Sequence, residues 1–446
     1  MALGSAAAAT LLSVGRVPRF GLSDRSRDTT DGDSLERLHA LGITGESVRV
    51  AVLDPTGFDP THDALGGAVE DIRQFGPERA VVDGTTHGTA AAASIARLAP
   101  AARLSLASFR RTGEFVDAID WARSRGVDVV LAPVAAYGSK ATPRSPVFRA
   151  ARRAVDAGCA FVAPTGNAAL GHWQGPYAAL AGDGSGTRRR LRVANRVGSS
   201  SPRGRFLAWL VTESSVDADL TLALFREVDG GERWNLVSLS RAARTTSGER
   251  LTADLSDGEY ALVVRPANQN ASDDSETADT TRELTSRVEI TTPTHLLASP
   301  RPSGSIAVPA SVPGVVAVGV TDDASRGDAL PTTAGPDSRA SDPASGSEVV
   351  SPHSGRGPTA SGTVGVDVVA PPSPWIAGGS PGTSAAAARA AGAVALVLDA
   401  APDLGPSDVA GILRASAGDV GRNGRDLAAG SGRLDVVAAV QRARSR

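Results

Sequence analysis

The chain of 446 residues contains almost no cysteine or lysine. Cys159 is the only cysteine, so no disulfide can form within the chain and no group of cysteines can bind a metal. Lys140 is the only lysine, and the other basic side chains with a fixed charge are arginines. The formal net charge is −2, and no basic stripe with interleaved aromatic residues occurs. The sequence therefore lacks the electrostatic footprint of a nucleic-acid-binding protein.

Long apolar runs are also missing. No uninterrupted apolar stretch of about 18 residues follows the N-terminus, so a membrane-spanning helix is not expected. The first fifteen residues, MALGSAAAATLLSVG, are similar to the apolar core of a signal peptide, although no Lys or Arg precedes them. This segment favours a secreted or cell-surface protein.

Glycine and proline, by contrast, are abundant. The chain has 49 Gly and 28 Pro, and 41% of its residues are hydrophobic. Such a composition is typical of a globular protein with many tight turns and a substantial core. At this length, we expect one large domain together with a smaller module.

Strand and helix patterns alternate over the first part of the chain. The apolar run VRVAVLD predicts a buried strand that ends on Asp54, and a helix of small residues begins near His87. The next segments, ARLSLASF, EFVDAIDWARSRG, VDVVLAPV, VFRAARRAVDAG and CAFVAP, predict strand and helix in turn. This alternation predicts an α/β fold with a mostly parallel, doubly wound sheet flanked by helices. Sites in such sheets form beyond the carboxyl ends of the strands, which places Asn167 near Asp54.

The pattern changes from about residue 188. Short alternating runs separated by Gly, Asp and Ser predict a small antiparallel β-sandwich over 188–292. The α/β pattern then resumes, so the sandwich interrupts a single α/β domain. We predict an N-terminal arm or signal-like segment over 1–35 and the α/β domain over 36–187 and 293–446.

Three separated residues carry candidate chemistry. Asp54 ends a buried strand, His87 stands at a small-residue helix, and Ser384 follows a Gly-rich turn at the start of a long apolar helix. Each has an ordinary structural explanation, as a turn residue, a structural histidine and a helix N-cap. Together they would supply a nucleophile, a base and a carboxylate that orients the base. Backbone N–H groups at the start of a helix could also stabilise an oxyanion beside Ser384.

Four blocks of sequence resemble those of the subtilisin family of serine peptidases. HALGITGESVRVAVLDPTGFDPTHDAL resembles the aspartate block, and THGTAAAASIARLAPAARL resembles the histidine block. CAFVAPTGNAA is similar to the block whose Asn is an oxyanion donor, and GTSAAAARAAGAVAL is similar to the serine block. The order Asp, His, Ser is also that of the family. The resemblance covers roughly residues 36–180 and 300–446.

The resemblance implies a subtilisin-like sheet and a serine endopeptidase that acts on peptides or proteins. It assigns Ser384 as nucleophile, His87 as general base, Asp54 as the residue that orients His87, and Asn167 as oxyanion donor. It implies no cofactor. The family often has a calcium-binding loop after the histidine helix, but here IARLAPAARLSL joins that helix directly to the next strand, and no metal site is expected.

Two segments depart from the family pattern. Pro55 is inserted after Asp54, and because proline fixes φ and has no N–H, the insertion could re-aim the Asp54 carboxylate. LAPVAAYG stands where the family has a strand that pairs with extended substrate. The resemblance assigns substrate binding to Pro133, Val134, Ala135 and Gly166. Pro133 has no N–H to donate, so we expect weaker or differently selective substrate binding.

Other functions are compatible with the same residues. A catalytically silent subtilisin-like scaffold could bind peptide or a partner protein, and an acyl transferase such as a peptide ligase could use the same nucleophile. The inserted β-sandwich could form a wall over the substrate groove, or it could bind a partner or a matrix.

Overall fold

The computed structural model describes residues 28–77, 79–139, 142–177, 196–198, 202–212, 220–228, 230, 233–241, 248–266, 287–323, 348–372 and 382–446. The signal-like segment at residues 1–15 lies outside the described residues. The described chain divides into two compact units. The α/β unit comprises residues of 28–135, 146–167 and 306–446, and the antiparallel unit comprises residues of 136–145 and 168–305.

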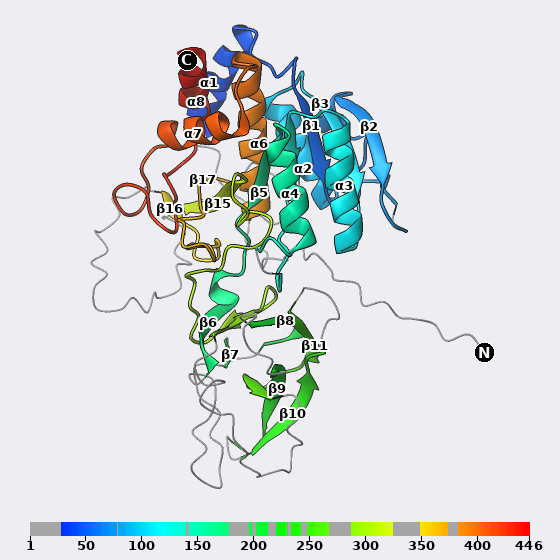
Figure 1. Ribbon diagram of the computed structural model, residues 1–446, viewed down its shortest axis with the longest axis vertical. Helices are drawn as coiled ribbons and strands as arrows, with labels where there is room; N and C mark the ends of the chain where they lie inside the picture. The colour runs from blue at the N-terminus through cyan, green and yellow to red at the C-terminus, as the bar shows by residue number, and fades with distance from the viewer. Residues whose placement is uncertain are drawn as a thin grey trace, which may run out of the picture. The chain divides into compact units, whose positions relative to one another are not determined.

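The α/β unit is built on an eight-stranded sheet with the order β16-β15-β5-β4-β1-β3-β2, in which β17 also pairs with β15 (Figure 1). Its strands are β1 (Arg49–Leu53), β2 (Val69–Gln74), β3 (Arg103–Ser108), β4 (Val129–Leu131), β5 (Ala160–Pro164), β15 (Val316–Asp323), β16 (Glu348–Val350) and β17 (Val368–Ala370). All pairings are parallel except that of β16 with β15. The predicted fold class, a mostly parallel sheet with flanking helices, is confirmed.

Helices cover both faces of this sheet. They are α1 (Asp28–Ala40), α2 (His87–Leu98), α3 (Thr112–Ser124), α4 (Pro146–Asp156), α6 (Thr383–Ala400), α7 (Pro406–Ser416) and α8 (Val436–Arg444), with a 3₁₀ turn η1 (Asp63–Leu65). The chain passes from β1 to the edge strand β2, returns through α2 to β3, and continues through α3 to β4 and through α4 to β5. Helix α3 packs on α4, whereas α2 packs on α6. Helix α6 packs on α2 and on the central strands β4 and β5.

The long apolar helix α6 is a core element. Among the described residues, it alone has the length and apolar composition of a membrane-spanning helix, and 83% of it is buried within the fold. Its alanines and Gly392 allow close approach to neighbouring helices, while Val394, Leu396 and Val397 fill the core beside the sheet.

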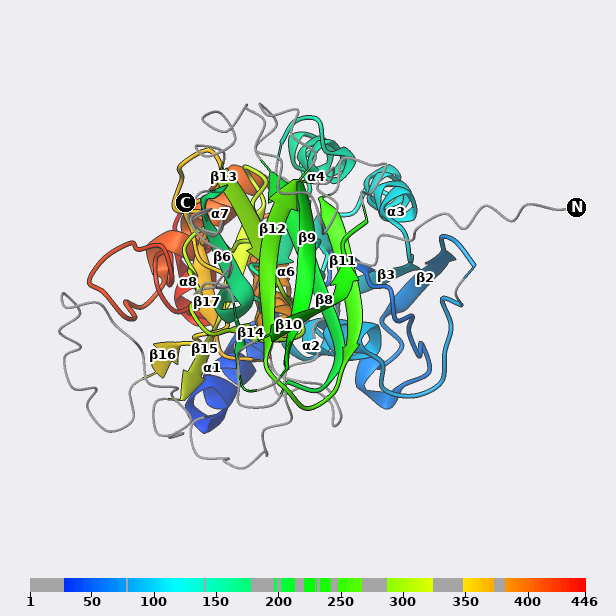
Figure 2. The same cartoon turned by 90° about the horizontal axis from the view of Figure 1, so that it is seen from below.

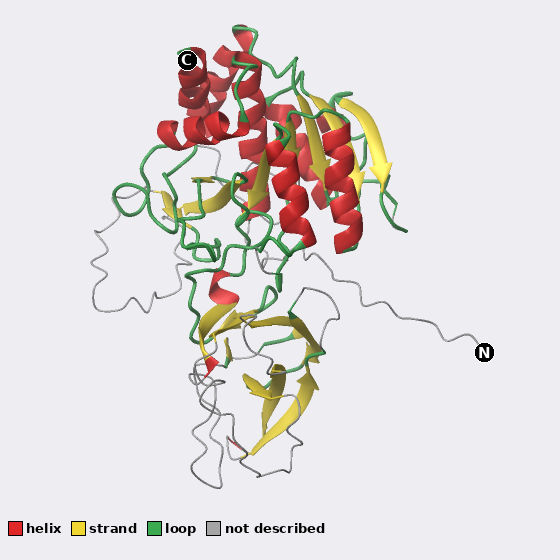
Figure 3. Ribbon diagram, in the orientation of Figure 1, coloured by secondary structure: helices red, strands yellow, loops and turns green. Residues whose placement is uncertain are grey.

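The antiparallel unit contains three small sheets, with the orders β10-β9-β12, β11-β8-β13-β6 and β14-β7 (Figure 2). Its elements are η2 (Ala169–Gly171), β6 (His172–Pro176), β7 (Val197–Gly198), β8 (Gly204–Thr212), β9 (Leu220–Val228), β10 (Arg233–Leu239), β11 (Glu249–Leu255), β12 (Tyr260–Pro266), β13 (Arg287–Thr291) and β14 (Leu296–Leu297). Strands dominate this unit, whereas the α/β unit mixes strands and helices (Figure 3). Trp173, Phe206, Leu222 and Leu251 belong to its separate core.

The inserted β-sandwich of the sequence analysis is thus partly seen, as antiparallel sheets. The polar stretch QNASDDSETADTTRE, within the predicted span 188–292, lies outside the described residues. Strands β6 and β14 lie before and after that span and pair with strands of the antiparallel unit. The described unit is therefore wider than 188–292.

Candidate active site

Asp54 follows the last residue of β1, at the carboxyl end of the sheet. Its backbone N–H donates to the Ala107 carbonyl of the neighbouring strand at 3.0 Å, which continues the parallel ladder by one residue. The side chain is fully buried. Its Oδ1 accepts hydrogen bonds from the Thr56 backbone N–H at 2.9 Å and from the Thr56 hydroxyl at 2.6 Å. A buried carboxylate is thus held by two donors from its own turn.

His87 is the first residue of α2, after the N-cap Thr86. Its Nδ1 lies 2.5 Å from Asp54 Oδ2, and its side chain is 15% exposed. A carboxylate can only accept, so Nδ1 carries the proton in this bond and Nε2 is the nitrogen that can act as a base. The Pro55 insertion leaves Asp54 and His87 within hydrogen-bond distance. The structure therefore brings these two predicted residues together.

Ser384 lies in the first turn of α6, after the N-cap Gly382. Its hydroxyl donates to the Pro133 carbonyl at 3.0 Å. A Cβ on Gly392 would lie 2.9 Å from the Leu98 Cβ and 3.5 Å from the Ile95 Cα, so glycine is what allows this contact with α2.

Both helices begin at the carboxyl end of the sheet. His87 pairs with Asp54, which directly follows β1. Ser384 is bonded to the carbonyl of Pro133, which lies two residues after β4, and β4 pairs in parallel with β1. The N-termini of α2 and α6, which carry His87 and Ser384, therefore lie at the same end of the sheet.

Asn167 follows β5, in the loop after the carboxyl end of that strand. Its Oδ1 accepts from the Thr383 backbone N–H at 3.0 Å and from the Thr383 hydroxyl at 2.9 Å. These bonds hold the carbonyl end of the carboxamide at the start of α6, one residue before Ser384. A Cβ on Gly382 would lie 2.9 Å from Asn167 Nδ2, so a side chain there would crowd the amide. The donor end of Asn167 is thus fixed beside the turn that presents the serine.

The predicted substrate-binding residues lie in two loops of the α/β unit. The Pro133 carbonyl is the acceptor for Ser384, and the Val134 N–H donates to the Ala132 carbonyl at 2.8 Å. Val134 and Ala135 are 1% and 6% exposed. Gly166 has a φ of 98°, a conformation that favours glycine, and its carbonyl accepts from the Gly355 N–H at 2.8 Å. Their role in substrate binding stays a prediction.

Two threonines of this site were not predicted from the sequence. Thr56 holds Asp54, and Thr383 holds Asn167. The available signal was position alone, since each is a hydroxyl residue within two positions of a predicted site residue. A threonine in such a place can hydrogen-bond locally in several ways, so the pattern did not identify its partner.

Comparison with known proteins identifies one segment of the chain. The model of the subtilase family, peptidase S8, matches residues 298–432, which contain Ser384 but not Asp54, His87 or Asn167. Among curated proteins, none matches the chain.

Several solved structures are similar over most of this chain. A lanthipeptide protease is 16% identical, with 91% of this chain and 90% of that chain covered and a TM-score of 0.48. Fervidolysin from Fervidobacterium pennivorans, a keratinolytic enzyme related to subtilisin, is 17% identical, with 97% and 50% covered and a TM-score of 0.49. The prenylagaramide maturation protease PagA is 14% identical, with 92% and 99% covered and a TM-score of 0.48. These likenesses are distant, and the family match is the finding that bears on function.

Proposed function

We propose that the chain is a serine endopeptidase of the subtilase family, the family whose model matches residues 298–432. The observation that carries the proposal is the 2.5 Å pair of His87 Nδ1 and Asp54 Oδ2, which lies at the same carboxyl end of the sheet as the start of α6. The substrates are peptides or proteins, as is usual for peptidases of this kind.

In the proposed reaction, His87 Nε2 takes the proton of Ser384 as Oγ attacks the carbonyl carbon of the scissile peptide bond. The Nδ1 proton stays on the imidazole and in its hydrogen bond to Asp54, which stabilises the imidazolium. The tetrahedral intermediate collapses when His87 donates the proton to the leaving amine. Water then attacks the acyl-enzyme while His87 takes a proton from it. His87 returns this proton to Ser384 Oγ as the acyl group leaves as a carboxylic acid.

The oxyanion of each tetrahedral intermediate would be stabilised by the Ser384 backbone N–H and the Asn167 amide. The first N–H groups of a helix lack partners within the helix and carry partial positive charge, so the start of α6 suits an anion. Thr383 supports this role, because its two bonds to Oδ1 orient the carboxamide with its donor, Nδ2, at the opposite end.

The test is labelling of the folded protein with a fluorophosphonate, which reacts with an activated serine. We expect covalent labelling of Ser384, detected by mass spectrometry of the modified peptide. The Ser384→Ala variant should not be labelled, and His87→Ala should be labelled far more slowly because the base is gone. A folded wild-type chain that takes no label would contradict the proposal.

A second candidate function is a silent scaffold that binds peptide without cutting it. The observations that favour it are the Ser384 hydroxyl bonded to the Pro133 carbonyl and the burial of Val134 and Ala135, where substrate would pair. Such a scaffold would bind an extended peptide, measured by fluorescence anisotropy, while the same peptide stayed intact over hours. Cleavage of the bound peptide, abolished by Ser384→Ala, would exclude it.

A further inference from the structure

The tripeptide Asp-Pro-Thr occurs twice in the segment between β1 and η1, at residues 54–56 and 59–61. In the first copy, the Thr56 N–H and hydroxyl both donate to Asp54 Oδ1, at 2.9 and 2.6 Å. In the second copy, the Thr61 N–H and hydroxyl both donate to Asp59 Oδ1, at 3.0 and 2.7 Å. The two copies thus form the same turn.

Proline explains why this turn takes one form. It has no N–H and a fixed φ, so the first backbone donor that can turn back to the aspartate is that of the following threonine. The threonine hydroxyl then lies beside the same carboxylate oxygen. In the second copy these donors lower the pKa of Asp59, with the Thr61 hydroxyl as the largest cause.

The first copy has one connection that bears on the site. The Thr56 hydroxyl also accepts a hydrogen bond from the Gly88 N–H at 2.9 Å, and Gly88 directly follows His87 in α2. The other oxygen of Asp54 is bonded to His87 Nδ1. A single hydroxyl therefore joins the Asp54 carboxylate to the backbone of the helix turn that carries His87. In the second copy, Asp59 Oδ2 instead accepts from the Gly84 N–H at 2.9 Å.

We propose that Thr56 is a positioning residue that holds the Asp54 carboxylate and the N-terminus of α2 in the relative geometry that pairs Asp54 with His87. This inference rests on the proposed peptidase function. With Oδ1 held by two donors, the carboxylate cannot rotate about its Cβ–Cγ bond without breaking them, so Oδ2 stays aimed at Nδ1. The bond from Gly88 fixes the first turn of α2, whose N–H groups have no acceptor within the helix. The inserted Pro55 thus belongs to a turn that keeps the pair together.

The test compares three variants with a built-in control. Thr56→Val removes the hydroxyl at nearly constant shape, Thr56→Ser restores it, and Thr61→Val removes the matching hydroxyl from the second copy. We expect the fluorophosphonate labelling rate of Ser384 to fall about tenfold or more in Thr56→Val, because small misplacements of a catalytic group are costly. The rate should return to within about threefold of wild type in Thr56→Ser, and Thr61→Val should label like wild type.

A second readout does not depend on activity. The proton on His87 Nδ1 should give a low-field ¹H NMR signal, assigned by its absence in His87→Gln. Thr56→Val should shift or broaden this signal, whereas Thr61→Val should leave it unchanged. Thermal unfolding of each variant shows whether it is folded under these conditions.

The outcomes separate the two proposals. If wild type takes no label, the peptidase proposal fails, while the NMR signal still tests the role of Thr56. If Thr56→Val labels like wild type and keeps the wild-type signal, the positioning role is overturned. Equal losses in Thr56→Val and Thr61→Val would also overturn it, because the effect would then belong to the segment in general.

Discussion

At the scale of one residue, Asn167 is held by the oxygen of its carboxamide, and the proposal assigns its nitrogen as the oxyanion donor. Its Oδ1 accepts two bonds from Thr383. Asn167→Ala should lower kcat by about 10²- to 10³-fold, equivalent to about 2.7–4 kcal/mol of barrier, with KM little changed. The reason is that an oxyanion donor acts on charge that develops only in the transition state. Steady-state kinetics on a fluorogenic peptide measures both parameters.

The matched control for Asn167 is Thr383→Ser, which keeps both donors to Oδ1. Its kcat should stay close to that of wild type, since the carboxamide keeps its orientation. A rise in KM with unchanged kcat in Asn167→Ala would show instead that Asn167 binds the ground state of the substrate.

Sequence patterns led to Asp54 and His87, and the structure pairs these two residues. The catalytic roles of all four residues stay predictions, although Ser384 lies in the first turn of α6 and the Asn167 side chain is bonded to Thr383 beside it. The patterns did not lead to Thr56. Pro55 shows that one backbone N–H is missing from the turn, but it does not show that Thr56 supplies the donors to Asp54. The bond from Ser384 to the Pro133 carbonyl also depends on a side-chain rotamer, which sequence does not specify.

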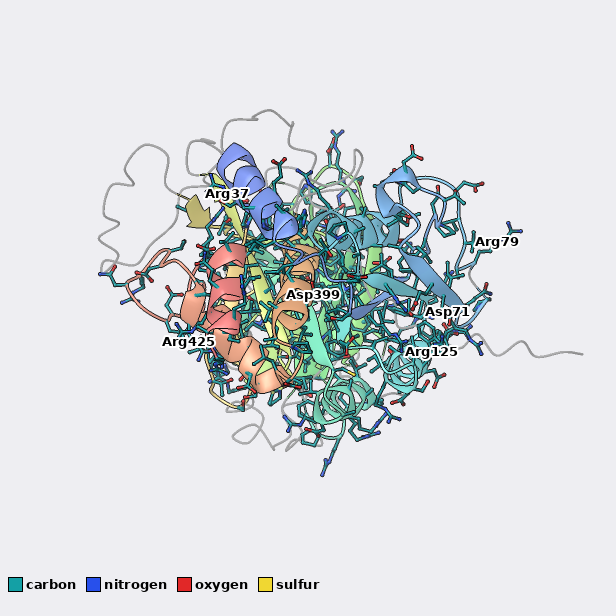
Figure 4. The ribbon with its side chains drawn as sticks, turned by 90° about the horizontal axis from the view of Figure 1, so that it is seen from above. Arg37, Asp71, Arg79, Arg125, Asp399 and Arg425 are labelled. Carbon is teal, nitrogen blue, oxygen red and sulfur yellow. The ribbon has the colours of Figure 1, made fainter. Side chains whose placement is uncertain are left out.

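At the scale of elements, Asp399 connects α6 to the segment that precedes β1. Asp399 lies in the last turn of α6 and is labelled in Figure 4. Asp399 accepts from the N–H groups of Thr44 and Gly45, at 3.0 and 2.9 Å, and from the Ser47 hydroxyl at 3.1 Å. An acidic side chain is unfavourable in the last turn of a helix, because the helix dipole is negative there. Its bonds to the loop offset that cost.

Removing this connection should destabilise the α/β unit. We expect Asp399→Ala to cost about 2 kcal/mol, since it leaves partly buried N–H groups of the loop without an acceptor. Asp399→Asn should cost less, because the amide oxygen can still accept and the unfavourable charge is removed. Urea denaturation followed by circular dichroism measures the change. The exposed Asp403→Ala is the control, expected within about 0.5 kcal/mol of wild type; an equal loss in both variants would refute a specific role for Asp399.

Most helices and strands of the α/β unit were predictable from their apolar periodicity, but strand β2 of this unit was not, and neither was strand β6 of the antiparallel unit. Strand β2, VEDIRQ, lies at the edge of the sheet and is mostly half-buried or exposed, so it has no apolar run. Strand β6, HWQGP, contains Gly and Pro, which argue against a strand in sequence terms. Both strands form because β3 and β13 offer backbone hydrogen-bond partners to β2 and β6. These pairings depend on the tertiary fold, so the local sequence of each segment does not predict them.

At the scale of the whole molecule, the sequence predicted that an α/β domain resumes after an antiparallel insertion. The strand order shows this return, because β15 pairs with β5 although the antiparallel unit lies between them in sequence. Periodicity predicted a change of class near residue 188, a position that lies outside the described residues. It could not reveal that residues 136–145 belong to the antiparallel unit, since a short loop segment has no periodicity.

Each unit contains a histidine whose burial affects its titration. In the antiparallel unit, burial lowers the pKa of His295 below its usual value of 6.5, against an opposing bond to the Arg203 carbonyl. In the α/β unit, burial lowers the pKa of His353 in the same way, against the opposing charge of Asp322. The folded state therefore favours neutral imidazole at both positions.

The sign of the pH dependence follows from proton linkage. Below pH 6.5 the unfolded chain binds more protons at these histidines than the folded chain does, so stability is fully present above this pH and falls as the solution is acidified. Each histidine contributes a slope of at most about 1.4 kcal/mol per pH unit. We expect His295→Gln to flatten the pH dependence of the antiparallel unit alone, and His353→Gln that of the α/β unit alone.

Hydrogen exchange between pH 7.5 and 5.5, followed by mass spectrometry of peptides from each unit, measures the two dependences separately after correction for intrinsic exchange rates. Each variant serves as the control for the other, because each changes one unit. Most carboxylates titrate below this window. Burial raises the pKa of Asp367, but this residue is the same in wild type and in both variants, so the difference in slope reports the substituted histidine. If either substitution left the slope of its own unit unchanged, burial of that histidine would not be a source of acid sensitivity, and the neutral imidazole would not be a condition for the stability of that unit.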